Sequence, residues 1–213
     1  MAHAAQRSFE PRKTPIQARS TLTVEAISEA TIQVLLGQGT DRLTTTRVAE
    51  RAGVSVGTLY QYFPNKQSLL FAVLENHLDK VAVAVEAACE RAHGKPLAEM
   101  VKEVTEAFVD AKMRRTDVST ALYRIAADVG GAALARRTSL RSQKALEAML
   151  GTAPDVVLHQ ERFAIQMMFA AMAGATRSVL EAGASPAMVR NVRDHLVLLC
   201  QSYMMAVAKP LPR

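Results

Sequence analysis

The sequence has no tryptophan, only two cysteines, and aromatic residues amounting to 5% of its 213 residues. Glycine and proline are also sparse, with ten and eight residues, and few stretches are rich in β-branched side chains. These scarcities argue against an all-β sandwich or barrel, a collagen-like chain and long disordered segments. Because 49% of the residues are hydrophobic, the chain can bury a sizeable core, which leucine, valine, alanine and methionine must build.

Disulfides, secretion and membrane insertion are all disfavoured. The two cysteines lie more than a hundred residues apart, which is not the spacing of a disulfide framework, so a reducing cytosol is the expected compartment. The N-terminal stretch lacks the apolar core of a secretory signal. No window of about 18 residues is free of charge, which disfavours a membrane span. We therefore expect a cytoplasmic protein with no membrane partner.

The charge balance is moderately basic. The chain carries 26 Lys and Arg against 20 Asp and Glu, a net charge of +6. This permits an anionic partner such as nucleic acid but does not require one, because many basic proteins bind none. Residues 1–18 are polar and basic, contain two prolines and offer little to bury, so we predict that they form a flexible basic arm.

Apolar residues recur at three- and four-residue steps along the rest of the chain, which is the period of amphipathic helices. Glycine, proline and capping residues separate these stretches. The pattern predicts an all-α protein of nine helices and no sheet, with three helices at the front and longer ones behind. The predicted helices cover residues 20–36, 45–52, 56–63, 66–92, 97–114, 117–129, 132–150, 156–182 and 186–207.

Residues 44–66, TTTRVAERAGVSVGTLYQYFPNK, have the pattern of two short helices joined by a tight turn. Gly53 stands where a helix-turn-helix needs a residue that tolerates positive φ. Val54 is the expected apolar plug of the turn, and Leu59 and Phe63 are expected to seat the second helix on the first helix of the chain. A plain helix-loop-helix corner is the alternative interpretation.

The outward side of the second short helix is small or hydrogen-bonding, and none of it is acidic. Its residues are Ser55, Val56, Gly57, Thr58, Tyr60, Gln61 and Tyr62. Gln61 can pair with adenine through two hydrogen bonds, and tyrosine hydroxyls can donate to phosphates. Thr45 and Thr46, together with the free N–H groups at their helix start, suit a phosphate, and Lys66 can clamp another. This coincidence within one short segment favours DNA binding over a plain corner.

The stretch from Arg19 to Leu74 resembles the N-terminal domain of TetR-family transcriptional regulators, through its first helix, the segment quoted above and the L-L-F-A-V-L run. The resemblance implies a homodimer whose recognition helices enter successive major grooves of a near-palindromic operator in double-stranded DNA. It assigns base edges to Val56, Gly57, Thr58 and Gln61, and the DNA backbone to Thr45, Thr46, Ser55, Tyr60, Tyr62 and Lys66. Tyr62 stands where many family members have histidine, and the arm residues Arg12, Lys13 and Arg19 are further candidates for DNA contacts.

The resemblance also divides the chain into the arm, a DNA-binding domain over 19–66, and a ligand-binding and dimerisation domain over 67–213. It implies a cavity for a small-molecule effector in the last of these. Bulky, adaptable side chains that could line the cavity are Met100, Phe108, Tyr123, Phe163 and Met167. Polar candidates to orient a ligand are Glu106, Asp110, Arg124 and Asp128. Ordinary core packing, or a solvated charge, is the alternative for each residue.

The last two predicted helices suit self-association. Ala171, Gly174 and Ala175 form a face of small residues, whereas Val192, Leu196 and Leu199 form an apolar stripe. Two such helices from each subunit would make a four-helix bundle across a two-fold axis. The alternative is that both helices pack only within one subunit.

Motifs of enzymes are missing: the sequence has no G-x-S-x-G, Walker A or G-x-G-x-x-G pattern. Cys89 and His93 stand four residues apart but lack a second pair of metal ligands, so we predict no metal and no cofactor. The sequence therefore predicts a DNA-binding repressor released by an effector, and not an enzyme. Two alternatives stay open: an all-α small-molecule-binding protein or enzyme that uses the C-terminal cavity, and an architectural nucleic-acid binder without an effector.

Overall fold

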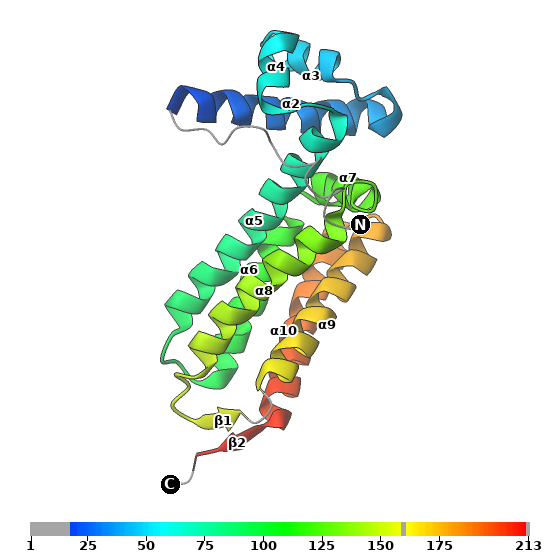
Figure 1. Ribbon diagram of the computed structural model, residues 1–213. Helices are drawn as coiled ribbons and strands as arrows, with labels where there is room; N and C mark the ends of the chain where they lie inside the picture. The colour runs from blue at the N-terminus through cyan, green and yellow to red at the C-terminus, as the bar shows by residue number, and fades with distance from the viewer. Residues whose placement is uncertain (1–17, 159–160, 212–213) are drawn as a thin grey trace, which may run out of the picture. The chain divides into compact units, whose positions relative to one another are not determined.

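The computed structural model describes residues 18–158 and 161–211, and these form nine helices and two short strands (Figure 1). The all-α fold class is therefore confirmed. The helices are α2 (Ala18–Arg42), α3 (Thr45–Ala52), α4 (Val56–Tyr62), α5 (Lys66–Ala92), α6 (Leu97–Met113), α7 (Thr116–Ile125), α8 (Gly131–Leu150), α9 (Glu161–Glu181) and α10 (Pro186–Val207). The strands are β1 (Val156–Leu158) and β2 (Ala208–Pro210).

The chain packs as two compact units. One contains the residues up to His77 together with Thr120–Leu134, and the other contains Leu78–Ser119 and the residues from Ala135 on. Helix α5 passes from the first unit into the second without a break. The packing boundary thus lies three turns beyond Lys66, where the sequence analysis divides the two functional domains; that division remains a prediction.

Helix α2 carries the core of the first unit on one face. Ile27, Val34 and their neighbours along that stripe are buried, and the buried hydroxyl of Thr31 donates to the Ile27 carbonyl at 2.7 Å. The helix runs beyond the stop predicted at Gly37, because a glycine inside a helix costs only about 1 kcal/mol. The interruption comes at Gly39, whose φ of 75° and ψ of 176° are not helical.

The start of α9 and the small sheet differ from the sequence expectation of a helix beginning at 156. Residues 156–158 are instead strand β1, which pairs antiparallel with β2, so that Val157 lies opposite Lys209. Pro154 and the two consecutive valines, which are β-branched, favour an extended chain here. The prediction of no sheet is therefore wrong in this one place.

In the second unit, α6 packs against α9 and α10. Met100 is completely buried, and the ring of Phe108 meets that of Phe169 edge-on, with centroids 6.2 Å apart. The start of α6 is capped from a distance. Pro96 offers no side-chain cap, and the carboxylate of Asp155 accepts the Leu97 N–H at 3.0 and 3.3 Å instead. The segment before β1 is thus held to the beginning of α6.

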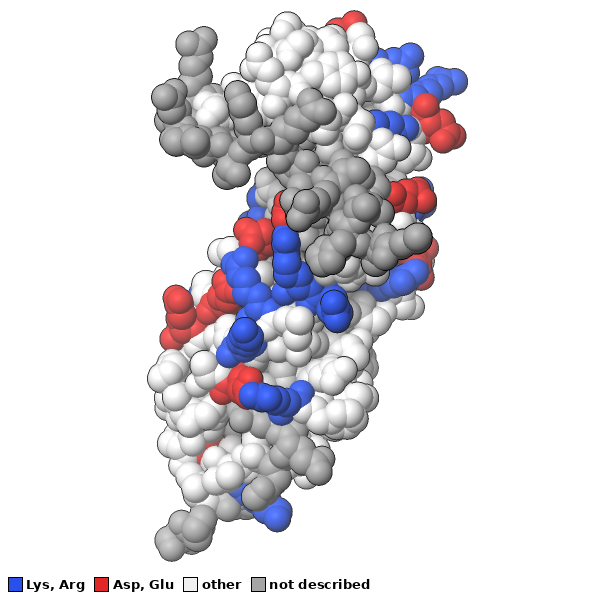
Figure 2. Space-filling view, in the orientation of Figure 1, with Lys and Arg blue, Asp and Glu red and all other residues white. Residues whose placement is uncertain are grey.

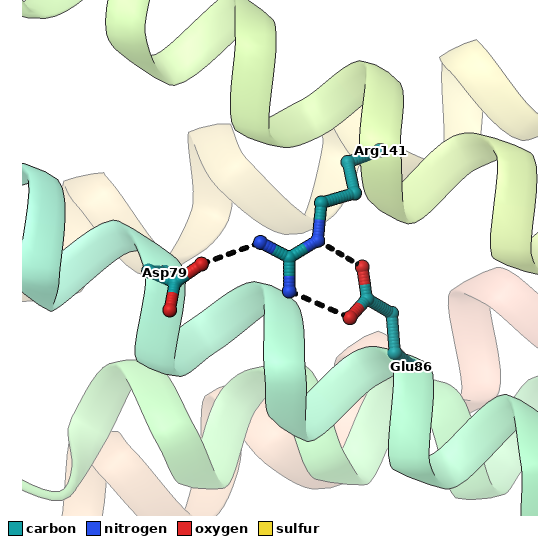
Figure 3. A network of polar contacts seen from close by, with 3 residues as sticks. All are labelled: Asp79, Glu86 and Arg141. Carbon is teal, nitrogen blue, oxygen red and sulfur yellow. Dashed lines mark hydrogen bonds and ion pairs between the residues drawn. The ribbon is translucent and has the colours of Figure 1, made fainter. Parts of the chain in front are cut away.

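An ionic network joins α5 to α8 within the second unit. Figure 2 shows basic side chains gathered over α8, with acidic ones beside them over α5. In Figure 3, the guanidinium of Arg141 donates to both oxygens of Glu86 and, through Nη1, to Asp79 at 2.5 Å. Hydrogen bonds to Glu86 and then to Asp79 raise the pKa of Arg141 above its ordinary value. We call these three residues the α5–α8 clasp.

Candidate nucleic-acid interface

The turn between α3 and α4 is closed by backbone hydrogen bonds around Gly53. This residue has φ 68° and ψ 29°, the left-handed conformation that glycine adopts without strain. Its N–H donates to Glu50 O at 3.2 Å, and the N–H of Val54 donates to Ala49 O at 3.0 Å. The turn chemistry predicted from the sequence is therefore present.

Each short helix begins with a side-chain cap. The Oγ1 of Thr44 accepts the Arg47 N–H at 3.3 Å, and the Oγ of Ser55 accepts the Thr58 N–H at 3.0 Å. Leu59 and Phe63 are buried, as the sequence predicts, and they fix which side of α4 faces out. A helix of seven residues would be marginal alone, so this burial is what holds α4 in place.

The residues predicted to contact DNA all reach the surface of the first unit. The exposed ones are Thr46, Ser55, Gly57, Tyr60 and Gln61, and the half-buried ones are Thr45, Val56, Thr58, Tyr62 and Lys66. The hydroxyls of Tyr60 and Thr45 lie 3.1 Å apart. This contact brings a predicted phosphate donor of α4 beside the N-terminus of α3, where backbone N–H groups are unpaired by the helix itself.

Lys66 has an internal partner that the sequence does not reveal. Its Nζ donates to the carbonyl of Thr40 at 2.5 Å, just after the interruption at Gly39. The ammonium thus lies at the C-terminal end of α2, where a cation is favourable. Whether or not it also meets a phosphate, this lysine stabilises the first unit.

Sequence reasoning gave no role to Arg47 and Arg51, two exposed arginines of α3. Nη1 of Arg47 donates to Gln38 Oε1 at 2.8 Å and to Arg42 O at 2.9 Å, and Nε of Arg51 donates to Gln33 Oε1 at 2.6 Å. Both side chains tie α3 to α2 and add positive charge to this unit. Only the position of the two arginines along α3 could have indicated that they face α2. Arg12 and Lys13 lie outside the described residues, as does the side chain of Arg19.

Two family models match the chain. Residues 27–73 match the model for bacterial regulatory proteins of the tetR family, and residues 96–204 match the tetracyclin repressor-like C-terminal domain. The chain belongs to the TetR family. It is therefore a DNA-binding transcriptional regulator, and the resemblance of its first third extends to its C-terminal half.

Curated relatives of this TetR-family chain align with about a quarter of its length. The nucleoid occlusion factor SlmA of Haemophilus ducreyi is 40% identical over 58 residues, which are 25% of this chain and 29% of that protein. The transcriptional repressor KstR of Mycolicibacterium smegmatis is 40% identical over 55 residues, 26% of this chain and 27% of that protein. The chain thus spans less than a third of the length of these two relatives.

Solved structures share the whole fold. A TetR-family regulator from Mesorhizobium loti has a TM-score of 0.73 at 16% identity, covering 90% of this chain and 99% of that one. The fatty acid degradation regulator FadR from Bacillus halodurans has a TM-score of 0.61 at 18% identity, covering 87% and 97%. At such identities the likeness establishes the fold.

The five residues predicted to line an effector cavity differ in burial and in the unit to which they belong, and their role remains a prediction. Met100 and Phe108 are buried in the second unit, whereas Tyr123 belongs to the first. Phe163 is 59% exposed and Met167 is 44% exposed, because α9 turns other residues inward. Of the polar candidates, Glu106 and Asp110 line a depression on the second unit, and Arg124 and Asp128 are exposed on the first.

The residues predicted for a dimer interface divide into two groups. Val192 and Leu196 are buried inside the subunit, so they already pack against its own core. Gly174 and Leu199 are exposed, and Ala171 and Ala175 are half-buried. Helices α9 and α10 pack on each other and expose five large apolar side chains, which are Phe163, Met167, Leu198, Leu199 and Met205.

Helix α9 is also notable for its composition. Among the described residues, Arg162–Glu181 is long and apolar enough to cross a membrane, with a mean hydropathy of 1.3, although 39% of the segment is buried inside the fold. The expectation that a membrane span is disfavoured rests on the absence of a charge-free window of about 18 residues, and a qualifying length and composition alone do not contradict it. A helix with one face in a core and another apolar face outward has the same composition.

The cysteine and histidine considered as metal ligands differ in their surroundings. Cys89 is buried, and its burial, reinforced by Glu86 and Glu90, raises the pKa of the thiol to about 12. His93 is exposed, and no group of three potential metal ligands occurs in the described part of the chain. A thiol that stays protonated is a poor metal ligand.

Proposed function

We propose that this TetR-family regulator is a cytoplasmic, homodimeric repressor that binds a near-palindromic operator and is released from it by a small molecule. The observation that carries the proposal is the outward side of α4. It combines exposed Gln61, exposed Tyr60 and the capped N-terminus at Ser55, on a helix whose other side is buried. A helix of this kind can enter a major groove with its first residues toward the base edges.

The ten residues that are predicted to contact DNA fall into two groups by the chemistry of their side chains. Gln61 has the amide that reads adenine, and the methyl groups of Val56 and Thr58 suit a thymine methyl, while Gly57 allows close approach. The hydroxyls of Thr45, Thr46, Ser55, Tyr60 and Tyr62, together with Lys66, are assigned to phosphates. The contact between Tyr60 and Thr45 supports this division, because it orients both hydroxyls before DNA arrives.

The exposed apolar side chains on α9 and α10 support a dimer. A second copy of the chain would cover these side chains. The dimer would then present two DNA-binding domains to two half-sites about one helical turn apart. A small molecule releases such a dimer only if it binds the state that does not fit DNA more tightly than the state that does. The proposal includes no catalytic step and leaves the small molecule unchanged.

The test is selection of bound fragments from a random DNA pool, followed by affinity measurements at physiological salt. We expect an inverted repeat. Gln61→Ala should alter the preferred base at one position of each half-site, by roughly 1–3 kcal/mol of discrimination. Tyr60→Phe should weaken binding to all sequences about equally, since a phosphate contact carries no sequence information.

Gln143→Ala serves as the matched control, because Gln143 lies on α8, where its amide donates to Ser139 Oγ at 2.9 Å. It should leave both affinity and base preference unchanged. A pool that yields no shared sequence would identify an architectural binder, and turnover of a bound small molecule would identify an enzyme. Either outcome overturns the proposal.

A further inference from the structure

A depression of about 420 Å³ lies on the second unit, open to solvent and lined by charged side chains from three places in the chain. It is formed by the end of α5, one side of α6 and the middle of α10. Its charged residues are Arg91, Lys95, Glu103, Glu106, Asp110 and Arg193. We call it the α6 groove.

The ion pairs across the α6 groove are uneven. Lys95 pairs closely with Glu103. Arg193 is held loosely: its Nε is 3.1 Å from Asp110 Oδ1, and its Nη2 is 3.4 Å from Asp110 Oδ2 and 3.5 Å from Glu106 Oε1. Charge-assisted hydrogen bonds are usually 2.7–2.9 Å long. The N–H at Nε is buried and meets no acceptor in hydrogen-bond geometry among the described residues.

The two ends of the groove therefore carry opposite excess charge. At one end, Glu106 and Asp110 share the single guanidinium of Arg193, which leaves one negative charge unmatched. At the other end, Arg91 is exposed and has no ion pair in the described part of the chain. Arg91 lies in the last turn of α5, and Lys95, in the connection that follows α5, pairs with Glu103 at the same end of the groove.

The distance between the two ends along α6 follows from the positions of Glu103 and Asp110 on the helix. Glu103 and Asp110 are seven residues apart on α6, which at 1.5 Å per residue is about 10 Å along the axis. A fully extended tripeptide also spans about 10 Å. A single α-amino acid, whose ammonium and carboxylate are both attached to one carbon, is too short to meet both ends.

We propose that the α6 groove binds a linear zwitterion about as long as a tripeptide, with its anionic end at Arg91 and its cationic end on the sides of Glu106 and Asp110 that face away from Arg193. A short peptide and an ω-amino acid of equal length share this chemistry. The site is separate from the operator-binding surface, and the proposal does not depend on the repressor function.

Isothermal titration calorimetry of the full chain at low salt tests the proposal, with trialanine, its N-acetylated form, its C-terminal amide, aminooctanoic acid and free alanine as probes. Trialanine should bind, and each capped form should bind at least tenfold more weakly, because each has lost one of the two charges. Equal binding of aminooctanoic acid would identify charge spacing as the recognised feature, whereas preference for the peptide would identify backbone contacts as well. Alanine should not bind.

Variants locate the binding in the groove. Arg91→Gln and Asp110→Asn should each weaken trialanine binding at least tenfold, while Arg190→Gln on α10 and Glu99→Gln on α6 should not change it. Arg190 and Glu99 are exposed and lie one turn from Arg193 and Glu103, outside the lining. Thermal unfolding of each variant serves as the structural readout.

Three results would overturn the proposal: no heat with trialanine, equal affinity for the capped forms, or unchanged affinity in the Arg91 and Asp110 variants. A purely structural network would lower the melting temperature of those variants and leave no peptide binding to lose. Since the titration contains no DNA, failure of the operator selection would leave its outcome unaffected.

Discussion

Lys112 lies on the buried side of α6, with only 5% of its surface exposed, and this burial lowers the pKa of its amine from 10.5 to about 8. The lowered pKa means that the folded state binds fewer protons than the unfolded state between about pH 8 and 10.5. The free energy of unfolding must therefore rise with pH across that window. Below it, the cost of burying the charge is fully present.

We expect Lys112→Met to stabilise the fold at pH 7. Each pKa unit corresponds to about 1.4 kcal/mol, so the gain is on the order of 3 kcal/mol. The gain should shrink as the pH rises from 8 and vanish near 10.5, where the unfolded lysine also loses its proton. Urea unfolding of the two proteins at a series of pH values measures this. Lys102→Met, at an exposed position of the same helix, should show no such trend.

At the scale of single residues, the sequence predicts which side chains are buried better than it predicts which groups they contact. The apolar anchors Leu59 and Phe63 follow from their four-residue spacing, and the structure buries both. The contact of Lys66 with Thr40 joins residues 26 positions apart across an interruption in α2, and no local pattern encodes it. Lys112 is likewise invisible to sequence reasoning, because one lysine on a long helix is normally exposed.

At the scale of elements, the contribution of the α5–α8 clasp to the free energy of unfolding can be measured. We expect Arg141→Ala to lower the free energy of unfolding by about 1–2 kcal/mol, since one guanidinium is shared by two carboxylates on a partly exposed surface. Arg141→Lys should recover only part of this, because an ammonium cannot donate in parallel to both oxygens of Glu86.

A double-mutant cycle between Arg141→Ala and Glu86→Gln should give a coupling of about 1 kcal/mol that falls as salt is added. Arg136→Ala, an exposed arginine of the same helix, is the matched control and should change stability little. A coupling near zero at low salt would mean that the clasp in Figure 3 contributes geometry and no stability.

Helices were more predictable than their ends. Periodicity indicated every helix of the described chain, but the predicted start of α9 lies five residues too early. That error arises because Val156–Leu158 is stabilised by β2, some fifty residues away, and because Asp155 is held by Leu97 at the start of α6. A local pattern of apolar residues cannot distinguish a strand that pairs at long range from the first turn of a helix.

At the scale of the whole molecule, the exposed apolar side chains of α9 and α10 predict an assembly. Leu199 is 50% exposed, so Leu199→Glu should not disturb the subunit but should desolvate a charge at the proposed dimer interface. We expect a monomer by light scattering and a loss of operator affinity of at least tenfold. Leu140→Glu, at a similarly exposed leucine of α8, should remain dimeric.

The predicted interface shows how sequence reasoning reaches its limit for assemblies. The stripe of Val192, Leu196 and Leu199 is regular, yet the first two residues are buried in the subunit and only the third is exposed. A helix with two apolar sides shows a single periodic pattern of apolar residues. The pattern therefore predicts that these residues are buried, but it does not distinguish packing inside the subunit from packing against a second subunit. The same limit applies to the residues predicted for the effector cavity, since Met100 is buried whereas Phe163 of α9 is exposed.

The first unit is discontinuous in the chain, and this affects how the protein can be divided. A side-chain carbon added at Gly131 would lie 2.8 Å from Cδ2 of Leu74, so the beginning of α8 touches α5 with no room to spare. Truncation after Lys66 would remove the rest of α5, and truncation after His77 would still remove residues 120–134 and uncover Leu74. Grafting this reading head onto another regulator would therefore require transplanting two separate stretches, or redesigning the surface that the missing one leaves bare.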